Sequence, residues 1–124
     1  MSKLSVSNLS VEFGGRGGLF SEGRVVKAVQ DVSFDLDPGR TLGLVGESGC
    51  GKSTTGLATM RLIEAKSGTV MFGDMDILKL KGANLRLLRS KIQIVFQDPF
   101  SSLNPRLTAA EIISEPLDIL NVGT

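Results

Sequence analysis

The amino-acid sequence predicts an α/β fold with an antiparallel β flap at its N-terminal edge. Three observations lead to this prediction. Several short β-like runs follow one another near the start, an apolar run then leads through a glycine-rich loop into a helical pattern, and a second apolar run follows further along the chain. Successive strands favour an antiparallel sheet, whereas strands that alternate with helices favour a parallel one.

The β flap begins with residues 4–13, where apolar side chains alternate in part and Asn8 interrupts the pattern. Residues 14–23 contain five glycines and are predicted to form a flexible surface loop. The rest of the flap consists of two short strands, residues 25–29 and 32–36, which end at the turn signal Asp37-Pro38-Gly39.

The central part of the chain carries the strand–loop–helix pattern. Residues 41–45 are apolar with little alternation, as is typical of a strand that is buried on both faces. A helix is predicted over residues 52–64, with apolar side chains that face the sheet. A short strand over residues 69–72 and a turn at Gly73-Asp74 follow.

The last third of the chain is predicted to contain two helices and one strand. A short helix covers residues 85–89, with Asn84 as its N-cap. Residues 92–96 form a second buried strand, and residues 98–106 form a loop punctuated by prolines. The final helix begins at Thr108 and is interrupted near Pro116.

Composition excludes several classes of function. The chain has 124 residues, which is enough for one domain. Its 14 basic and 13 acidic residues give a net charge of +1, which argues against a nucleic-acid partner. It contains no histidine, so no histidine-dependent catalysis or metal ligation is expected within it. Because neither a signal peptide nor a membrane-spanning run is visible, a cytosolic protein is expected.

A phosphate-binding loop is the strongest motif. Residues 46–53 match the P-loop pattern G-x-x-x-x-G-K-[ST] between an apolar run and a helical pattern. Glycines allow the backbone N–H groups to approach a triphosphate, and the helix start adds further N–H groups. Lys52 is predicted to contact the β- and γ-phosphates, Ser53 to ligate Mg²⁺ and Thr54 to donate to a more distal phosphate. The residues predicted to bind the nucleotide in this segment are Gly46, Glu47, Ser48, Gly49, Cys50, Gly51, Lys52, Ser53 and Thr54.

The second motif is a glutamine at the end of an apolar run. Ile92 to Pro99, which reads Ile-Gln-Ile-Val-Phe-Gln-Asp-Pro, resembles the Q-loop of ABC ATPases. The amide of Gln97 can contact Mg²⁺ or water without carrying a charge, so Gln97 is predicted to be a catalytic and metal-binding residue. Without the P-loop, an ordinary polar residue at a strand end would be the simpler interpretation.

Longer segments narrow the resemblance. Residues 43–56, residues 96–106 and Glu115-Pro116-Leu117 are similar to the oligopeptide/dipeptide branch of ABC importers, and the likeness covers nearly the whole chain. This resemblance implies ATP and Mg²⁺ as cofactors and an aromatic residue of the flap that stacks on adenine. Phe13 is the first candidate for that residue and Phe20 the second, while ordinary packing of either side chain is the alternative.

The sequence also departs from a complete member of that family. Residues 1–124 are predicted to be a partial ABC-type nucleotide-binding domain, incomplete at the C-terminus, because no signature motif, acidic Walker B strand or switch histidine occurs in them. Glu111 and Glu115 lie in a helical pattern and are interpreted as solvated helix residues. The chain is therefore expected to bind nucleotide without completing hydrolysis, although its parent family is an ATPase.

Three functional hypotheses follow. The first is the ATP-binding component of a peptide-type ABC importer, peripheral on the cytoplasmic face of the membrane. It would be partnered by membrane subunits through loop 98–106 and by a second ATP-binding subunit. Peptides are the first substrate class by resemblance, with glutathione, nickel and other small solutes left open. The second hypothesis is a small P-loop kinase or GTPase, and the third is a nucleotide-binding remnant without turnover.

Overall fold

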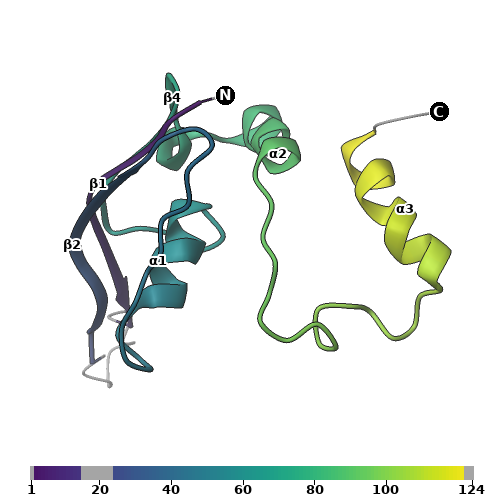
Figure 1. Ribbon diagram of the computed structural model, residues 1–124, viewed down its shortest axis with the longest axis horizontal. Coiled ribbons are helices and arrows are strands. Elements are labelled where there is room, and N and C mark those ends of the chain that lie inside the picture. Colours follow the sequence, from purple (N-terminus) through teal and green to yellow (C-terminus); the bar gives the residue numbers. More distant parts are fainter. Residues whose placement is uncertain (1, 15–23, 122–124) are drawn as a thin grey trace, which may run out of the picture. The chain divides into compact units, whose positions relative to one another are not determined.

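The computed structural model describes residues 2–14 and 24–121. These residues divide into two compact units, Met1–Leu80 and Lys81–Thr124, each of which is described by itself (Figure 1). Phe20 and nearly all of the predicted glycine-rich loop lie outside the described residues. No helix within the described ranges combines the length and the apolar character that a membrane span requires.

An antiparallel sheet forms the framework of the first unit. Its strands lie in the order β2-β1-β3-β4, and every pairing is antiparallel. The predicted β flap is therefore confirmed, although the two short strands expected over residues 25–36 form one continuous strand. The strands are β1 (Leu4–Phe13), β2 (Val26–Leu36), β3 (Ser67–Phe72) and β4 (Met75–Asp76), and a short 3₁₀ helix, η1 (Ile77–Lys79), follows them.

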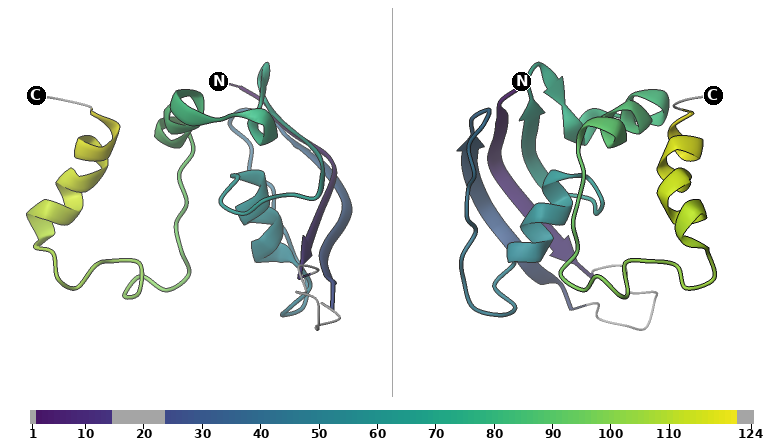
Figure 2. Two further views of the ribbon diagram at one scale, coloured as in Figure 1. Left: turned by 180° about the vertical axis from the view of Figure 1, so that it is seen from behind. Right: turned by 45° about the vertical axis from the view of Figure 1, so that its right-hand side comes forward.

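The core of the first unit lies between this sheet and helix α1 (Lys52–Thr59). Figure 2 shows α1 against one face of the sheet. Burial of the apolar face of the sheet supplies most of the stabilisation, at about 25 cal/mol per Å². The buried apolar side chains of this unit are Val6, Leu9, Val11, Val29, Ala58, Val70 and Ile77.

Helix α1 ends earlier than its sequence pattern predicts. It stops at Thr59 instead of continuing to Glu64, because Met60 leaves the helical region and Arg61 takes a left-handed conformation with φ of 53°. The N–H groups of Met60 and Arg61 donate to Gly56 O at 3.1 Å and Ala58 O at 2.9 Å, which closes the last turn. The chain then turns back toward β3, and Lys66 N donates to Ser10 O at 2.8 Å.

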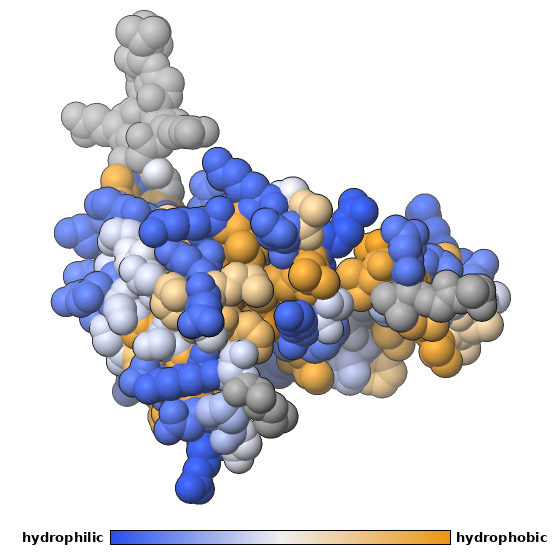
Figure 3. All heavy atoms as spheres, turned by 90° about the horizontal axis from the view of Figure 1, so that it is seen from above, coloured by the Kyte–Doolittle hydropathy of each residue, from blue (hydrophilic) through white to orange (hydrophobic). Residues whose placement is uncertain are grey.

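The two strands predicted to be buried are not strands. Residues 41–45 and 92–96 pair with no strand among the described residues, and the prediction was wrong for both. Val45 is 94% exposed and Val95 is 96% exposed. A buried strand needs neighbours that complete its backbone hydrogen bonds, and no described segment supplies them here. Figure 3 shows apolar side chains, in orange, open at the surface.

The second unit contains helices α2 (Gly82–Lys91) and α3 (Ala109–Leu120). Helix α2 begins earlier than predicted, so Asn84 lies inside it and Lys81 occupies the N-cap position. Thr108 caps α3 as predicted, in a capping box with Glu111. Pro116 does not interrupt α3, since a proline removes only its own N–H bond and a helix can continue past it with a bend.

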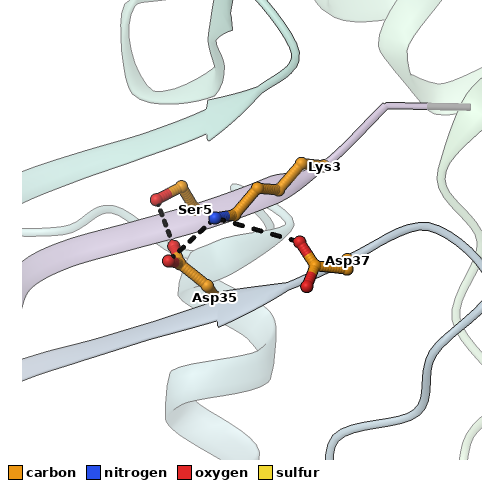
Figure 4. Close-up of polar contacts among 4 residues, drawn as sticks. All are labelled: Lys3, Ser5, Asp35 and Asp37. Atoms are coloured by element: carbon orange, nitrogen blue, oxygen red, sulfur yellow. Dashed lines mark hydrogen bonds and ion pairs between the residues drawn. The ribbon is translucent and has the colours of Figure 1, made fainter.

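A polar cluster fastens the start of β1 to the end of β2 (Figure 4). Lys3 Nζ lies 2.9 Å from Asp35 Oδ2 and 3.9 Å from Asp37 Oδ1. Ser5 Oγ donates to Asp35 Oδ1 across the same strand pair. The hydrogen bonds from Ser5 and then Lys3 lower the pKa of the Asp35 carboxyl below its usual value of 3.8. Lys3, Asp35 and Asp37 are exposed and Ser5 is half-buried. The cluster supports the end of the sheet that carries Leu4 and Leu36.

Candidate functional site

The predicted phosphate-binding loop leads directly into α1. Gly51 is the N-cap of α1 and takes a left-handed conformation with φ of 95°. A Cβ at this position would lie 2.4 Å from Ala28 O on β2, so no larger residue fits without movement of the strand. A Cβ at Gly46 would lie 2.4 Å from Cys50 Sγ, so the exposed Cys50 side chain occupies the space beside Gly46.

The Lys52 ammonium group folds back over this loop. Its Nζ donates to the carbonyl oxygens of Gly46 and Glu47, the second at 2.8 Å, and lies 3.6 Å from Cys50 Sγ. A further bond from Cys50 N to Glu47 O, at 3.2 Å, closes the turn. None of the ion pairs found between described residues involves Lys52. The cation is therefore held by neutral carbonyls, and an anionic oxygen would be a stronger partner.

The first turn of α1 leaves its N-terminal groups open. The N-cap has no side-chain hydrogen bond, and the first turn contains no acidic residue. Thr55 is buried and its Oγ1 donates to Gly51 O at 2.7 Å, whereas Ser53 is exposed and Thr54 is half-buried. Since the first N–H groups of a helix have no partner within it, this arrangement suits an anion.

Phe13 lies at the last position of β1, where it pairs with Val26. Phe13 is 45% exposed, so it is accessible at the surface of the first unit. Figures 1 and 2 both show the end of β1 and the loop before α1 at the same end of the first unit. An aromatic ring at this position can serve as a stacking platform for a base beside a phosphate site.

Gln97 and the loop that follows it belong to the second unit. Gln97 is exposed, as is Phe100, which is 90% exposed. The Asp98 carboxylate organises the start of the loop by accepting from Phe100 N at 3.0 Å and Ser101 N at 3.4 Å. The Ser101 hydroxyl, followed by these two N–H groups, lowers the pKa of Asp98 below 3.8. Because the P-loop lies in the other unit, a shared Mg²⁺ site of Ser53 and Gln97 stays a prediction.

Two site-supporting residues are missing from the sequence prediction. Ala28 O and the Val29 side chain lie directly behind Gly51, where a Cβ would meet them at 2.4 and 3.5 Å. No local pattern marks these residues, because their role depends on a strand that lies far from the loop in the sequence. Among the described residues, no group of three or more His, Cys, Asp or Glu side chains could hold a metal ion.

Comparison with known proteins places this geometry in context. The family model described as ABC transporter matches residues 29–120. The chain is 55% identical over 120 residues to the glutathione import ATP-binding protein GsiA of Pectobacterium atrosepticum, with 96% of the chain aligned. It is 50% identical over 116 residues, 93% of the chain, to the "Probable peptide ABC transporter ATP-binding protein y4tS" of Sinorhizobium fredii.

A solved structure shares the fold. The chain is similar to the dimeric structure of the ATP-binding cassette MJ0796 in a post-hydrolysis state bound to ADP and Pi, with a TM-score of 0.78 and 26% identity over 98% of the chain. The chain spans only part of these proteins: 49% of the MJ0796 chain, 19% of the Pectobacterium protein and 33% of the Sinorhizobium protein.

Proposed function

Because this chain belongs to the ABC transporter family, we propose that it supplies the phosphate-binding half of an ATP site in an importer. Family membership decides against a small kinase or GTPase. The relatives that align with the chain are ATP-binding proteins of import systems by name. The observation that carries the proposal is the Lys52 ammonium group, which lies over a glycine loop at an open helix start and donates to neutral carbonyl oxygens among the described residues.

In this proposal, different groups of the chain contact the phosphates, Mg²⁺ and the base. The N–H groups from Gly49 to Thr54 would surround the β- and γ-phosphates, and the Lys52 ammonium group would exchange its carbonyl partners for phosphate oxygens. The Ser53 hydroxyl fits Mg²⁺ as one oxygen ligand, since this ion keeps several waters and takes its other ligands from the phosphates. Bound Mg²⁺ would offset phosphate charge, while the ring of Phe13 would stack on adenine.

Titration of the chain with Mg-ATP tests the proposal. Lys52→Ala should weaken binding by roughly 1.5–3 kcal/mol, or about 10- to 150-fold, because a charge-assisted contact is lost. Lys79→Ala is the matched control: its ammonium group is also in the first unit but pairs with Asp76 at 3.1 Å, away from the loop. Equal affinity of the folded Lys52→Ala variant and the control would refute the phosphate site.

We further propose that the complete protein drives uptake of peptides, with glutathione included in that class. The relatives that support this are a glutathione import protein and a peptide transporter protein. A second ATP-binding subunit would complete the nucleotide site, as the dimeric state of the MJ0796 structure suggests. The assembled protein would lie on the cytoplasmic face of the membrane.

Gln97 and residues 98–106 are proposed to couple the nucleotide to the membrane subunits. Pro99 and Pro105 restrict this loop, and Phe100 is open for contact with a partner helix. In the complete protein with its membrane subunits in vesicles, Gln97→Ala or Phe100→Ala should leave ATP affinity nearly intact and reduce transport-coupled hydrolysis. Much weaker ATP binding with normal coupling at saturation would contradict the coupling role.

A further inference from the structure

The β1–β2 hairpin contains two bulges that compensate one another, one in each strand. Asn8 lies in the first and Asp31 in the second, and the strand register that they disturb is restored beyond them. Between the pairs Val6–Phe34 and Leu9–Val32, β1 has one residue more than β2. Between the pairs Leu9–Val32 and Val11–Val29, β1 has one residue fewer than β2.

Side chains secure both bulges from the opposite strand. Asn8 and Asp31 both take left-handed conformations, with φ of 50° and 51°. Asn8 N donates to Ser33 Oγ at 2.8 Å, and Asp31 N donates to Ser10 Oγ at 2.9 Å. Asn8 Nδ2 also donates to Asp31 Oδ1 at 2.6 Å. We call this set of four residues the Asn8–Asp31 clasp. Asn and Asp are the residues that tolerate this conformation best after glycine.

The first bulge determines on which face of the sheet the side chains at the end of β1 lie. Val6, Leu9 and Val11 are all buried. Val6 and Leu9 are three positions apart, so their side chains can lie on the same face of the sheet only if the strand contains an extra residue between them. Without that residue, the period of two would place Val11 and Phe13 on the face opposite to Val6. The bulge at Asn8 therefore places Phe13 on the same face of β1 as Leu9 and Val11, whose side chains are buried in the core of the first unit.

The part of the hairpin beyond the clasp rests on the start of α1. A third irregularity follows between the pairs Val11–Val29 and Glu12–Lys27, where β2 has Ala28 as its extra residue. The carbonyl oxygen of Ala28 is the group that closely approaches Gly51, the N-cap of α1. The same stretch of backbone thus connects the clasp, the phosphate-binding loop and the strand end that carries Phe13.

We propose that the Asn8–Asp31 clasp is a positioning device that holds Phe13 over the adenine end of the nucleotide site. The proposal rests on the proposed nucleotide binding. Two offset bulges increase the local twist of the hairpin, and the cross-strand bonds keep that twist at one value. The clasp touches no nucleotide itself, so its effect should appear in recognition of the base and not of the phosphates.

The test compares Mg-ATP with magnesium tripolyphosphate, which lacks the base and ribose, in titrations of the full chain. Asn8→Asp places two carboxylates opposite each other and should lower the affinity for ATP by roughly 5- to 150-fold, the range for loss of a base–aromatic stack. Its affinity for tripolyphosphate should stay within about twofold of wild type. Phe13→Ala should reproduce this pattern, whereas Lys52→Ala should weaken both compounds.

Exchange of the two side chains provides the rescue. The double variant Asn8→Asp/Asp31→Asn restores an amide–carboxylate pair in the reverse direction and should recover most of the lost ATP affinity. Asp35→Asn is the control, because it removes a charge from the polar cluster of Lys3, Ser5 and Asp35, which lies near the last residue of β2. If Asn8→Asp does not fold, Asn8→Gly keeps the left-handed backbone and removes only the side-chain bond, and it should show the same selective loss.

The outcomes separate the two proposals. Wild-type chain that binds neither compound would overturn the proposed function and, with it, the clasp. If the wild-type chain binds both compounds and a folded Asn8→Asp or Asn8→Gly variant binds ATP as tightly as the wild type does, only the clasp proposal is overturned. Parallel losses for ATP and tripolyphosphate would also overturn it, since they would indicate a general effect on folding and not on the position of Phe13.

Discussion

The two units of this chain differ in how far each completes its own core. In the first unit, four antiparallel strands pair with one another, and α1 covers them with buried side chains on both sides of the contact. In the second unit, α3 has a strongly apolar composition and yet buries none of its residues. Local antiparallel pairing thus supports the glycine-rich loop before α1 from within the chain. The apolar side chains of α3, by contrast, have no complete partner surface among the described residues.

Truncation of an apolar side chain in each unit should give the largest contrast. Leu9 is fully buried at the centre of β1, so Leu9→Ala should lower the free energy of unfolding by roughly 2–5 kcal/mol. Ile113 on α3 is 74% exposed. Ile113→Ala should therefore change the free energy of unfolding by less than about 0.5 kcal/mol. Denaturant unfolding measures both values, and a cost for Ile113→Ala as large as that for Leu9→Ala would show that α3 is packed in solution.

Two glycines at helix starts should give an intermediate contrast. Gly51 and Gly82 both have positive φ, of 95° and 55°, but a Cβ at Gly82 would meet nothing within 4 Å, whereas one at Gly51 would meet Ala28 O. Gly82→Ala should therefore cost only the backbone strain, about 1–2 kcal/mol. Gly51→Ala adds a steric clash and should cost more, with loss of Mg-ATP binding. Thermal unfolding and nucleotide titration of both variants check this, and equal costs would contradict the close packing of β2 on the loop.

Protonation of Glu111 in acid should produce the smallest effect, at the start of α3. Two hydrogen bonds from Thr108, first from its N–H at 2.7 Å and then from its hydroxyl, lower the pKa of Glu111 below its usual value of 4.5. A lowered folded-state pKa contributes stability above pH 4.5 that is lost as the pH falls through the folded-state value. Circular dichroism should therefore show fraying of the first turn of α3 in acid.

Glu111→Gln is the matched control for the acid experiment, because an amide keeps an acceptor for the cap and does not titrate in this range. The change in helical signal between pH 7 and acid should be smaller in this variant. An unchanged acid transition would show that another group, such as the Asp98 carboxylate in the preceding loop, is responsible.

The sequence by itself determined the elements whose signals are local. The glycine-rich turn before α1, the alternation in β1, the turn at Gly73-Asp74 and the Thr108 cap were all predictable, because each depends on neighbours within a few residues. The resemblance of the loop and of the Gln97 segment to the ABC family was also readable from residue order, and the family match confirmed it.

Only the tertiary structure decided which apolar runs are buried and how the loop is supported. Residues 41–45 and 92–96 have the composition of buried strands, but burial is a property of a strand and its neighbours together, and no described segment pairs with either run. The contact of Ala28 O with Gly51 and the clasp between Asn8 and Asp31 join residues that are distant in the sequence. Their bonds depend on the strand register, which local propensity does not specify.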